Sequence, residues 1–188
     1  MDKPAEILSC DRVELRRWRT ADLAELARAT AESLEHLIPW MPWAASHDRQ
    51  QTAEFLARNQ VEWQSGEGFG YAITAASAVV GSCGLVRRIG PGGLEIGYWL
   101  HPRWTGQGLA TMAAGALVRE AFALAGTERV EIHHDAANPA SGAVARRLGL
   151  TEVSRAPAPE GPEAPGETGI RVIWRMTAEQ WASGAGGS

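Results

Sequence analysis

The segment HPRWTGQGLAT, residues 101–111, contains residue types that could bind a charged group. Arg103 is followed by Gly106 and Gly108, and an apolar stretch typical of a helix begins directly after them. The first N–H groups of a helix have no partner within it and lie at the positive end of its dipole, and glycines let a ligand approach the backbone. Residues 105–110 therefore predict a pyrophosphate site. The glycines alone would equally fit a tight strand-to-helix turn, since the chain has 21 of them.

Several other chemistries are not supported by the sequence. The only lysine is Lys3, so neither a P-loop lysine nor a buried Schiff-base lysine is present. GSCG at 81–84 is not a G-x-S-x-G turn, and Thr111 stands where a dinucleotide-binding loop would need its third glycine. Cys10 and Cys83 have no metal-ligand spacing and form no disulfide framework. We expect no metal site.

Charge and hydropathy bear on partners and location. The net charge of -4 argues against nucleic acid as the main partner. The first residues lack the apolar core of a signal peptide, and no apolar run approaches the ~20 residues of a membrane span. We expect a cytoplasmic protein with no membrane partner.

The length of 188 residues, with 45% hydrophobic residues, fits a single domain over 1–188. The segment PAPEGPEAPGE, residues 157–167, is too rich in Pro, Gly and Glu to pack. We expect this loop and the C-terminal tail SGAGGS to be flexible.

The order of strands and helices follows from periodicity and turn residues. Alternation predicts a strand at 13–18, and helices are expected from Thr20 and from Asp48 to about Ser65. Three successive strands, separated by short turns, are typical of an antiparallel meander; they are 69–75, 79–89 and 94–100. The remaining elements are then a helix at 108–125, a strand at 129–134, a helix capped by Asn138, and strands at 151–156 and 168–176.

The segments LEIGYWLHPRWTGQGLAT and VEIHHDAANPASGAVARRLGLTEV resemble the GNAT superfamily of N-acetyltransferases, in its RimJ/RimL-like branch. R-x-x-G-x-G at 103–108 matches the family's loop for the pyrophosphate of acetyl-CoA. N-x-x-S at 138–141 and LGL at 148–150 match its second conserved block, in family order and spacing. The resemblance is sharp over about 94–153 and looser elsewhere, and Leu150 stands where many members carry Phe.

The resemblance implies an α+β fold with a mixed, mostly antiparallel central sheet of about seven strands, flanked by helices. The two middle strands, 94–100 and 129–134, would splay apart, and the pantetheine of acetyl-CoA, the acyl donor, would fill the gap and bond exposed backbone groups. The residues expected to bind acetyl-CoA are Trp99, Leu100, Arg103, Thr105, Gly106, Gln107, Gly108, Leu109, Ala110, Thr111, Asn138 and Ser141.

Acetyl transfer from a thioester to an amine needs a neutral amine and a proton for the leaving thiolate. Glu95 is the candidate base, because alternation puts it on one strand face with Gly97 and Trp99; a solvent-facing strand residue is the alternative. Ser141 is the candidate proton donor, because the resemblance places the family's thiol-side hydroxyl there. Tyr98 is the alternative donor, although alternation puts it with the core-facing residues.

Two aromatic residues predict the acceptor end of the site. Trp40 and Trp43 lie between the first two predicted helices, in a region that rims the acceptor site in the family, and with Glu95 they are the expected acceptor-binding residues. A buried hydrophobic plug is the alternative for the tryptophans. His133 and His134 are adjacent in a strand and point to opposite faces, so they cannot form a compact metal pair, and we expect structural roles for both.

We therefore expect an acetyl-CoA-dependent N-acetyltransferase that acts on a primary amine by direct attack in a ternary complex, as a monomer or homodimer. The RimJ/RimL resemblance suggests protein N-termini as acceptors, with a small amine metabolite or antibiotic as the alternative. A non-catalytic acyl-CoA-binding module is the alternative to an enzyme. Glu160, Glu163 and Glu167 in the 157–167 loop predict an acidic rim that attracts the cationic amine.

Overall fold

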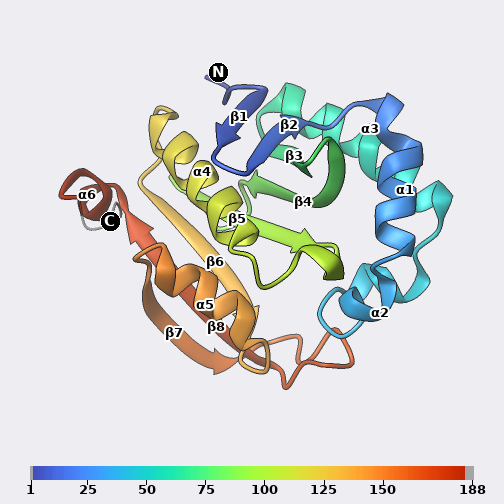
Figure 1. The fold of residues 1–188 in the computed structure, drawn as a ribbon. Helices are drawn as coiled ribbons and strands as arrows, with labels where there is room; N and C mark the ends of the chain where they lie inside the picture. Colours follow the sequence, from blue (N-terminus) through green and yellow to red (C-terminus); the bar gives the residue numbers. More distant parts are fainter. Residues whose placement is uncertain (1, 185–188) are drawn as a thin grey trace.

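The computed structural model describes residues 2–184, which form one eight-stranded sheet with helices on both faces (Figure 1). The strands are β1 (Ile7–Cys10), β2 (Val13–Arg17), β3 (Gly68–Ala75), β4 (Ala78–Val86), β5 (Gly93–Leu100), β6 (Arg129–Asp135), β7 (Thr151–Pro157) and β8 (Ile170–Thr177). Their order in the sheet is β1-β2-β3-β4-β5-β6-β8-β7, and only β5 and β6 pair in parallel. The predicted α+β fold with a mixed, mostly antiparallel sheet is confirmed.

The sequence analysis missed the edge strand β1, which brings the number of strands to eight rather than about seven. It forms a hairpin with β2, and Asp11 in the turn has a φ of 48°. β1 is only four residues long and none of them is fully buried, so its alternation is a weak local signal. Its place depends on pairing with β2 and on contact with the helix above the sheet, which are tertiary effects.

The helices divide between the two faces of the sheet (Figure 1). α1 (Leu23–Ala31) and α3 (Arg49–Ser65) pack on one face, and α4 (Leu109–Ala123) and α5 (Pro139–Arg147) on the other. The short helices α2 (Leu34–Leu37) and α6 (Ala178–Ala182) were not predicted.

The predicted cap of α5 is present in the structure, and α3 begins at its predicted residue with a cap that the sequence analysis did not identify. The Asp48 carboxylate accepts a hydrogen bond from the Gln51 amide at 2.8 Å, so Asp48 begins α3. Asn138 begins α5, because its side-chain oxygen accepts a hydrogen bond from the Ser141 amide at 3.3 Å. Both helices therefore start where their local sequence indicates.

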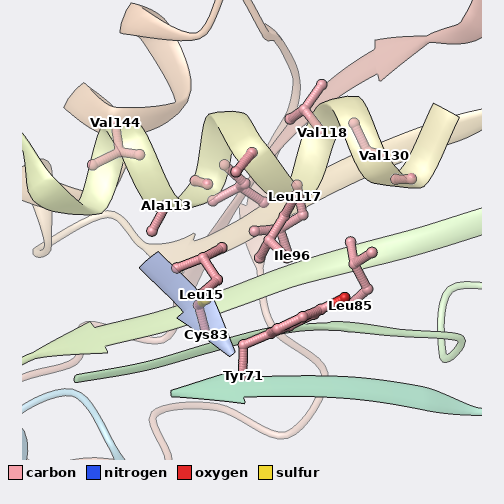
Figure 2. Packing of buried hydrophobic residues seen from close by; sticks show 14 of the residues in the cluster. Leu15, Tyr71, Cys83, Leu85, Ile96, Ala113, Leu117, Val118, Val130 and Val144 are labelled. Atoms are coloured by element: carbon pink, nitrogen blue, oxygen red, sulfur yellow. The ribbon is translucent and has the colours of Figure 1, made fainter. Parts of the chain in front are cut away.

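α4 is held rigidly above the centre of the sheet. Ala113 and Leu117 point down from α4 toward Leu15, Leu85 and Ile96 of the strands, and all five side chains are buried (Figure 2). Small residues along α4 let the helix lie close to the sheet. The direction in which its N-terminus points is thereby fixed.

The two middle strands diverge, as the family resemblance implied. β5 and β6 pair only through Gly93↔Arg129, Leu94↔Val130 and Glu95↔Glu131. Beyond these pairs β5 continues to Leu100, while β6 continues to Asp135 in pairing with β8. The backbone of β5 beyond Glu95 therefore has no ladder partner on the β6 side within the described residues.

The loop between β7 and β8 packs against the rest of the molecule more than its composition predicted. Ala164 is buried, and the Gly166 amide donates a hydrogen bond to the Pro39 carbonyl at 2.9 Å. The Asp135 carboxylate accepts hydrogen bonds from the amides of Thr168, Gly169 and Ile170. The expectation that residues 157–167 do not pack is wrong, because Ala164 is buried and Gly166 bonds Pro39, while Asp135 anchors the residues that follow. The flexibility of the loop stays a prediction.

The C-terminal tail, predicted to be flexible, lies largely outside the described residues. Among residues 2–184 there is no helix with both the length and the apolar character needed to cross a bilayer.

Candidate active site

A cavity of about 1820 Å³ follows the opening between β5 and β6. The predicted site residues that line it are Trp40, Trp43, Glu95, Trp99, Leu100, Thr105, Gly106, Gly108, Leu109, Ala110, Thr111, Asn138 and Ser141. Arg103 and Gln107 are not among the lining residues. The fold thus brings the two sequence blocks together in one elongated site.

The glycines of the predicted phosphate loop have the backbone conformation that favours glycine. Gly106 has a φ of 72° and Gly108 a φ of 79°, and a Cβ on either would meet no atom within 4 Å. Gly108 is the N-cap of α4, and no side chain caps the helix there. The first amides of α4 are therefore free to bond an anion, and the space in front of the loop is open.

The buried His101 holds the backbone that leads from β5 into this loop. Its Nδ1 accepts a hydrogen bond from the Arg103 amide at 3.2 Å, so its Nε2 carries the proton and donates to the Glu32 carboxylate at 3.1 Å. That bond lowers the pKa of Glu32 below its ordinary value. The Gln107 side chain donates to the Arg103 carbonyl at 3.1 Å, so Gln107 braces the loop from within.

Arg12, in the β1–β2 turn, is a cationic residue near this loop that the sequence analysis did not single out. Its guanidinium donates a hydrogen bond to the Gln107 carbonyl. The two residues are far apart in the chain, and no local pattern connects them. Of the hairpin that contains Arg12, only the second strand, β2, was predicted.

Two hydroxyl groups meet in the middle of the cavity. The Tyr98 and Ser141 hydroxyl oxygens are 2.9 Å apart, and Asn138 holds the Ser141 amide. Burial raises the pKa of Tyr98 to about 12, although the hydrogen bond with Ser141 acts in the opposite direction. Tyr98 therefore keeps its proton at neutral pH. Alternation placed Tyr98 in the core, but because β5 and β6 diverge, its half-buried side chain reaches across the opening to α5.

Glu95 lies at the point where β5 and β6 separate. It is 7% exposed, so the alternative of a solvent-facing strand residue does not hold. Arg88 binds both of its carboxylate oxygens, Nε to Oε2 at 2.8 Å and Nη2 to Oε1. This pairing raises the pKa of Arg88. The predicted base is thus a buried carboxylate that a guanidinium already engages on both oxygens.

His133 and Glu131 form a second charged group beside Glu95. The Nε2 atom of His133 is 2.6 Å from Glu131 Oε2, and its Nδ1 is 3.7 Å from Glu95 Oε2. Arg175 donates to the other oxygen of Glu131 at 2.7 Å. Burial alone would raise the pKa of Glu131, but the hydrogen bonds from His133 and Arg175 lower it below its ordinary value. The sequence carried a signal for this pair, since residues two apart on a strand share a face.

His134 has different surroundings. Its Nε2 accepts a hydrogen bond from the Trp174 indole at 3.0 Å, which agrees with the structural role expected from the sequence. Within residues 2–184 no group of three or more His, Cys, Asp or Glu side chains could hold a metal ion.

Aromatic residues and the β7–β8 loop surround the Glu95 end of the cavity. Trp43 is 40% exposed and its ring centroid lies 6.4 Å from that of Trp99, so Trp43 is no buried plug. Trp40 lines this cavity and also a second one of about 480 Å³. The second cavity is also lined by Glu95, His133, Glu160, Glu163 and Glu167.

Residues 12–151 match the family model described as "Acetyltransferase (GNAT) domain". The chain belongs to the GNAT acetyltransferase family. It is accordingly an N-acetyltransferase, and acetyl-CoA is its acyl donor. The predicted family, enzyme class and acyl donor are confirmed.

Solved structures of the same fold cover almost the whole GNAT chain. RimL, a ribosomal L7/L12 alpha-N-protein acetyltransferase in complex with coenzyme A, has a TM-score of 0.83 and 23% identity, covering 92% of this chain and 98% of its own. RimJ of Mycobacterium smegmatis, in complex with CoA-disulfide, has a TM-score of 0.80 and 23% identity, covering 98% and 95%. The microcin C7 self-immunity acetyltransferase MccE, in complex with acetyl-CoA and AMP, has a TM-score of 0.81 and 20% identity, covering 89% and 93%.

Proposed function

We propose that this GNAT enzyme acetylates the N-terminal amine of a polypeptide. The observation that carries the proposal is a pair of cavities at the acceptor end. Both are lined by Glu95, His133 and Trp40. A polypeptide N-terminus needs room for an α-amine, for the first side chain and for the chain that continues outward. Two cavities lined by one shared set of polar groups provide that room, and the exposed Trp43 offers an apolar surface beside them.

The donor half of the site supports a direct transfer in a ternary complex. In this proposal the amides at the start of α4 bind the pyrophosphate, and the unpaired backbone at Trp99 and Leu100 bonds the pantetheine amides. The thioester then lies beside the Tyr98–Ser141 hydroxyl pair, which protonates the departing thiolate. Both substrates are held in one elongated cavity, so no acyl-enzyme is required.

A peptide panel tests the acceptor class. Thiol release from acetyl-CoA would be followed with short peptides that have a free N-terminus, with the same peptides blocked at the N-terminus, and with small amines. We expect the highest kcat/KM for free N-termini, and mass spectrometry should place the acetyl group on the α-nitrogen. The blocked peptides serve as matched controls and should give no product.

The principal alternative acceptor is a small amine metabolite or antibiotic, which the likeness to MccE keeps open. Transfer to small amines without transfer to any free N-terminus would contradict the polypeptide proposal and leave the family assignment intact.

A further inference from the structure

His133 stands between two buried carboxylates at the junction of β5 and β6. Its two ring nitrogens point to different partners, Nε2 to Glu131 at 2.6 Å and Nδ1 to Glu95 at 3.7 Å. The side chain also lines both cavities at the acceptor end. We propose that His133 takes the proton from the acceptor amine and that Glu131 is the positioning residue that orients its ring; this inference rests on the function proposed above.

The hydrogen bonds around the ring set its tautomer. Glu131 Oε2 is an acceptor within hydrogen-bond distance of Nε2, so Nε2 carries the ring proton in the neutral imidazole. Nδ1 then presents a lone pair. Within the described residues Nδ1 has no hydrogen bond, and Glu95 Oε2 lies 3.7 Å away, which is longer than a hydrogen bond, so the lone pair is free to accept a proton.

Each of the two carboxylates forms an ion pair with an arginine. Glu95 is bound by Arg88, and Glu131 by Arg175, with Arg129 3.4 Å from the same oxygen of Glu131. Charge balance in this cluster therefore does not require a proton on His133. When the ring does take a proton, a carboxylate lies beside each nitrogen and stabilises the imidazolium.

Further charged groups face the same space from neighbouring elements. They are Asp135 on the same strand, Arg171 on β8, and Glu160, Glu163 and Glu167 on the β7–β8 loop. Asp135 is engaged by loop amides, and Arg171 pairs with Glu160. The groups that contact the imidazole directly are thus Glu131 and Glu95.

The division of labour between Glu95 and His133 follows from these contacts. Both oxygens of Glu95 accept hydrogen bonds from Arg88, whereas Nδ1 of His133 has an uncommitted lone pair. A proton acceptor needs a free lone pair within reach of the amine. Each Glu95 oxygen keeps a further lone pair, but its negative charge is already paired with Arg88, whereas His133 Nδ1 accepts no hydrogen bond within the described residues. We therefore assign proton transfer to His133 and stabilisation of the resulting charge to Glu95.

The proposed step balances in atoms and charge. The ammonium form of the acceptor gives one proton to Nδ1 of His133, and the nitrogen lone pair attacks the acetyl carbonyl carbon. As the C–N bond forms and the C–S bond breaks, the thiolate leaves with the bonding electron pair. The thiolate takes a proton from the Tyr98–Ser141 pair. The nitrogen loses its second proton, and this proton restores the one that the pair gave up. His133 then releases its proton to water.

The test compares His133→Gln and His133→Asn with wild type across pH, using a peptide acceptor. At neutral pH we expect kcat/KM to fall by about 10²-fold or more, the usual contribution of a general base. An α-amine has a pKa near 8, so at pH above about 9 most of the acceptor is already neutral and the deficit should shrink. Acetyl-CoA affinity, measured by calorimetry, should stay close to wild type and report that the variants are folded.

Two matched substitutions complete the experiment. His134→Gln makes the same change one residue along the strand and should lower stability without a pH-dependent loss of rate. Glu95→Gln should lower the rate by a smaller factor than the His133 variants, and this deficit should also shrink above pH 9, because Glu95 acts only through the imidazolium. The inference is overturned if folded His133 variants stay within a factor of two of wild type, if their deficit is equal at every pH, or if Glu95→Gln has a larger pH-dependent deficit than the His133 variants. Wild-type protein that acetylates no amine would overturn the proposed function, and this inference with it.

Discussion

The hydroxyl groups of Tyr98 and Ser141 are within hydrogen-bond distance, so we expect them to act as a unit. We expect Ser141→Ala and Tyr98→Phe each to lower kcat by ~10²-fold, the usual contribution of acid-base catalysis, with little change in acetyl-CoA affinity. Because each change breaks the same relay, the double variant should lose no more than the more damaging single change. Steady-state kinetics of the three variants measure this. Mild single effects with a severe double effect would mean that the two hydroxyls are redundant donors instead.

At this same scale, the sequence predicted the site residues that depend on local structure. Asn138 was predicted because asparagine is a common N-cap and stands directly before a helix. Gly108 was predicted because a glycine stands at the start of α4. Arg88 was missed, because no local pattern shows that its side chain folds back onto Glu95. A structural role was predicted for His133, since alternation assigns a face to a residue but not the partners that meet it there.

Among the elements, the start of α4 depends most on one residue type, because Gly108 has a positive φ there. Replacing Gly108 by Asp would put a carboxylate where the proposed phosphate binds, and we expect acetyl-CoA affinity to fall by about fivefold or more, since unit charges 4 Å apart interact by ~1 kcal/mol even in water. Aspartate is also a good N-cap, which offsets part of the strain of a positive φ, so the fold should persist. Calorimetric titration with acetyl-CoA measures the change.

Gly126 provides the matched control, because it has a φ of 80° and, as at Gly108, an added Cβ would meet no atom within 4 Å. It lies beyond the C-terminal end of α4. Gly126→Asp therefore adds the same strain and the same charge at the opposite end of the helix, and should leave acetyl-CoA affinity unchanged. Equal loss of affinity in both variants, or none in Gly108→Asp, would contradict binding at the N-terminus of α4.

Elements with strong local signals were predicted, and elements stabilised by distant contacts were not. The β3–β4–β5 meander and α3 carry clear periodicity or a capping box. β1 depends on β2 and α4, and the β7–β8 loop depends on Asp135, a residue on β6. The splay of β5 from β6 was inferred from family resemblance, but their parallel pairing was not predicted, because alternation does not distinguish a parallel neighbour from an antiparallel one.

Across the whole molecule, charge is distributed in a way that suits two different substrates. Arg12 and Arg103 lie near the phosphate loop and Arg147 lines the cavity, so cationic groups gather toward the donor end. Glu163 and Glu167 line the second cavity, at the proposed acceptor end. With the proposed function, an anionic donor and a cationic acceptor would therefore be attracted to opposite ends of one site, although the net charge is only -4.

The loop glutamates differ in how much they can contribute to capture of the acceptor. Glu160 pairs with Arg171, and Glu167 Oε2 accepts hydrogen bonds from the Glu163 and Ala164 amides, so replacing either would disturb the loop itself. Glu163 is exposed, and among the described residues its carboxylate has no hydrogen-bond partner. Glu163→Gln therefore removes charge with the least structural change.

We expect Glu163→Gln to raise the acceptor KM about twofold at low salt, since a unit charge ~8 Å from the ammonium contributes roughly 0.5 kcal/mol in water. At 1 M salt, where the screening length is about 3 Å, the difference should vanish, and kcat should be unchanged throughout. Glu179→Gln is the matched control: it removes the same charge from α6, beyond the far end of β8 and roughly 25 Å from the loop, where a charge acts with only ~0.2 kcal/mol. Acceptor KM values for both variants at several salt concentrations decide the matter. If Glu163→Gln matches wild type at low salt, or if Glu179→Gln raises KM equally, the acceptor does not approach past this loop.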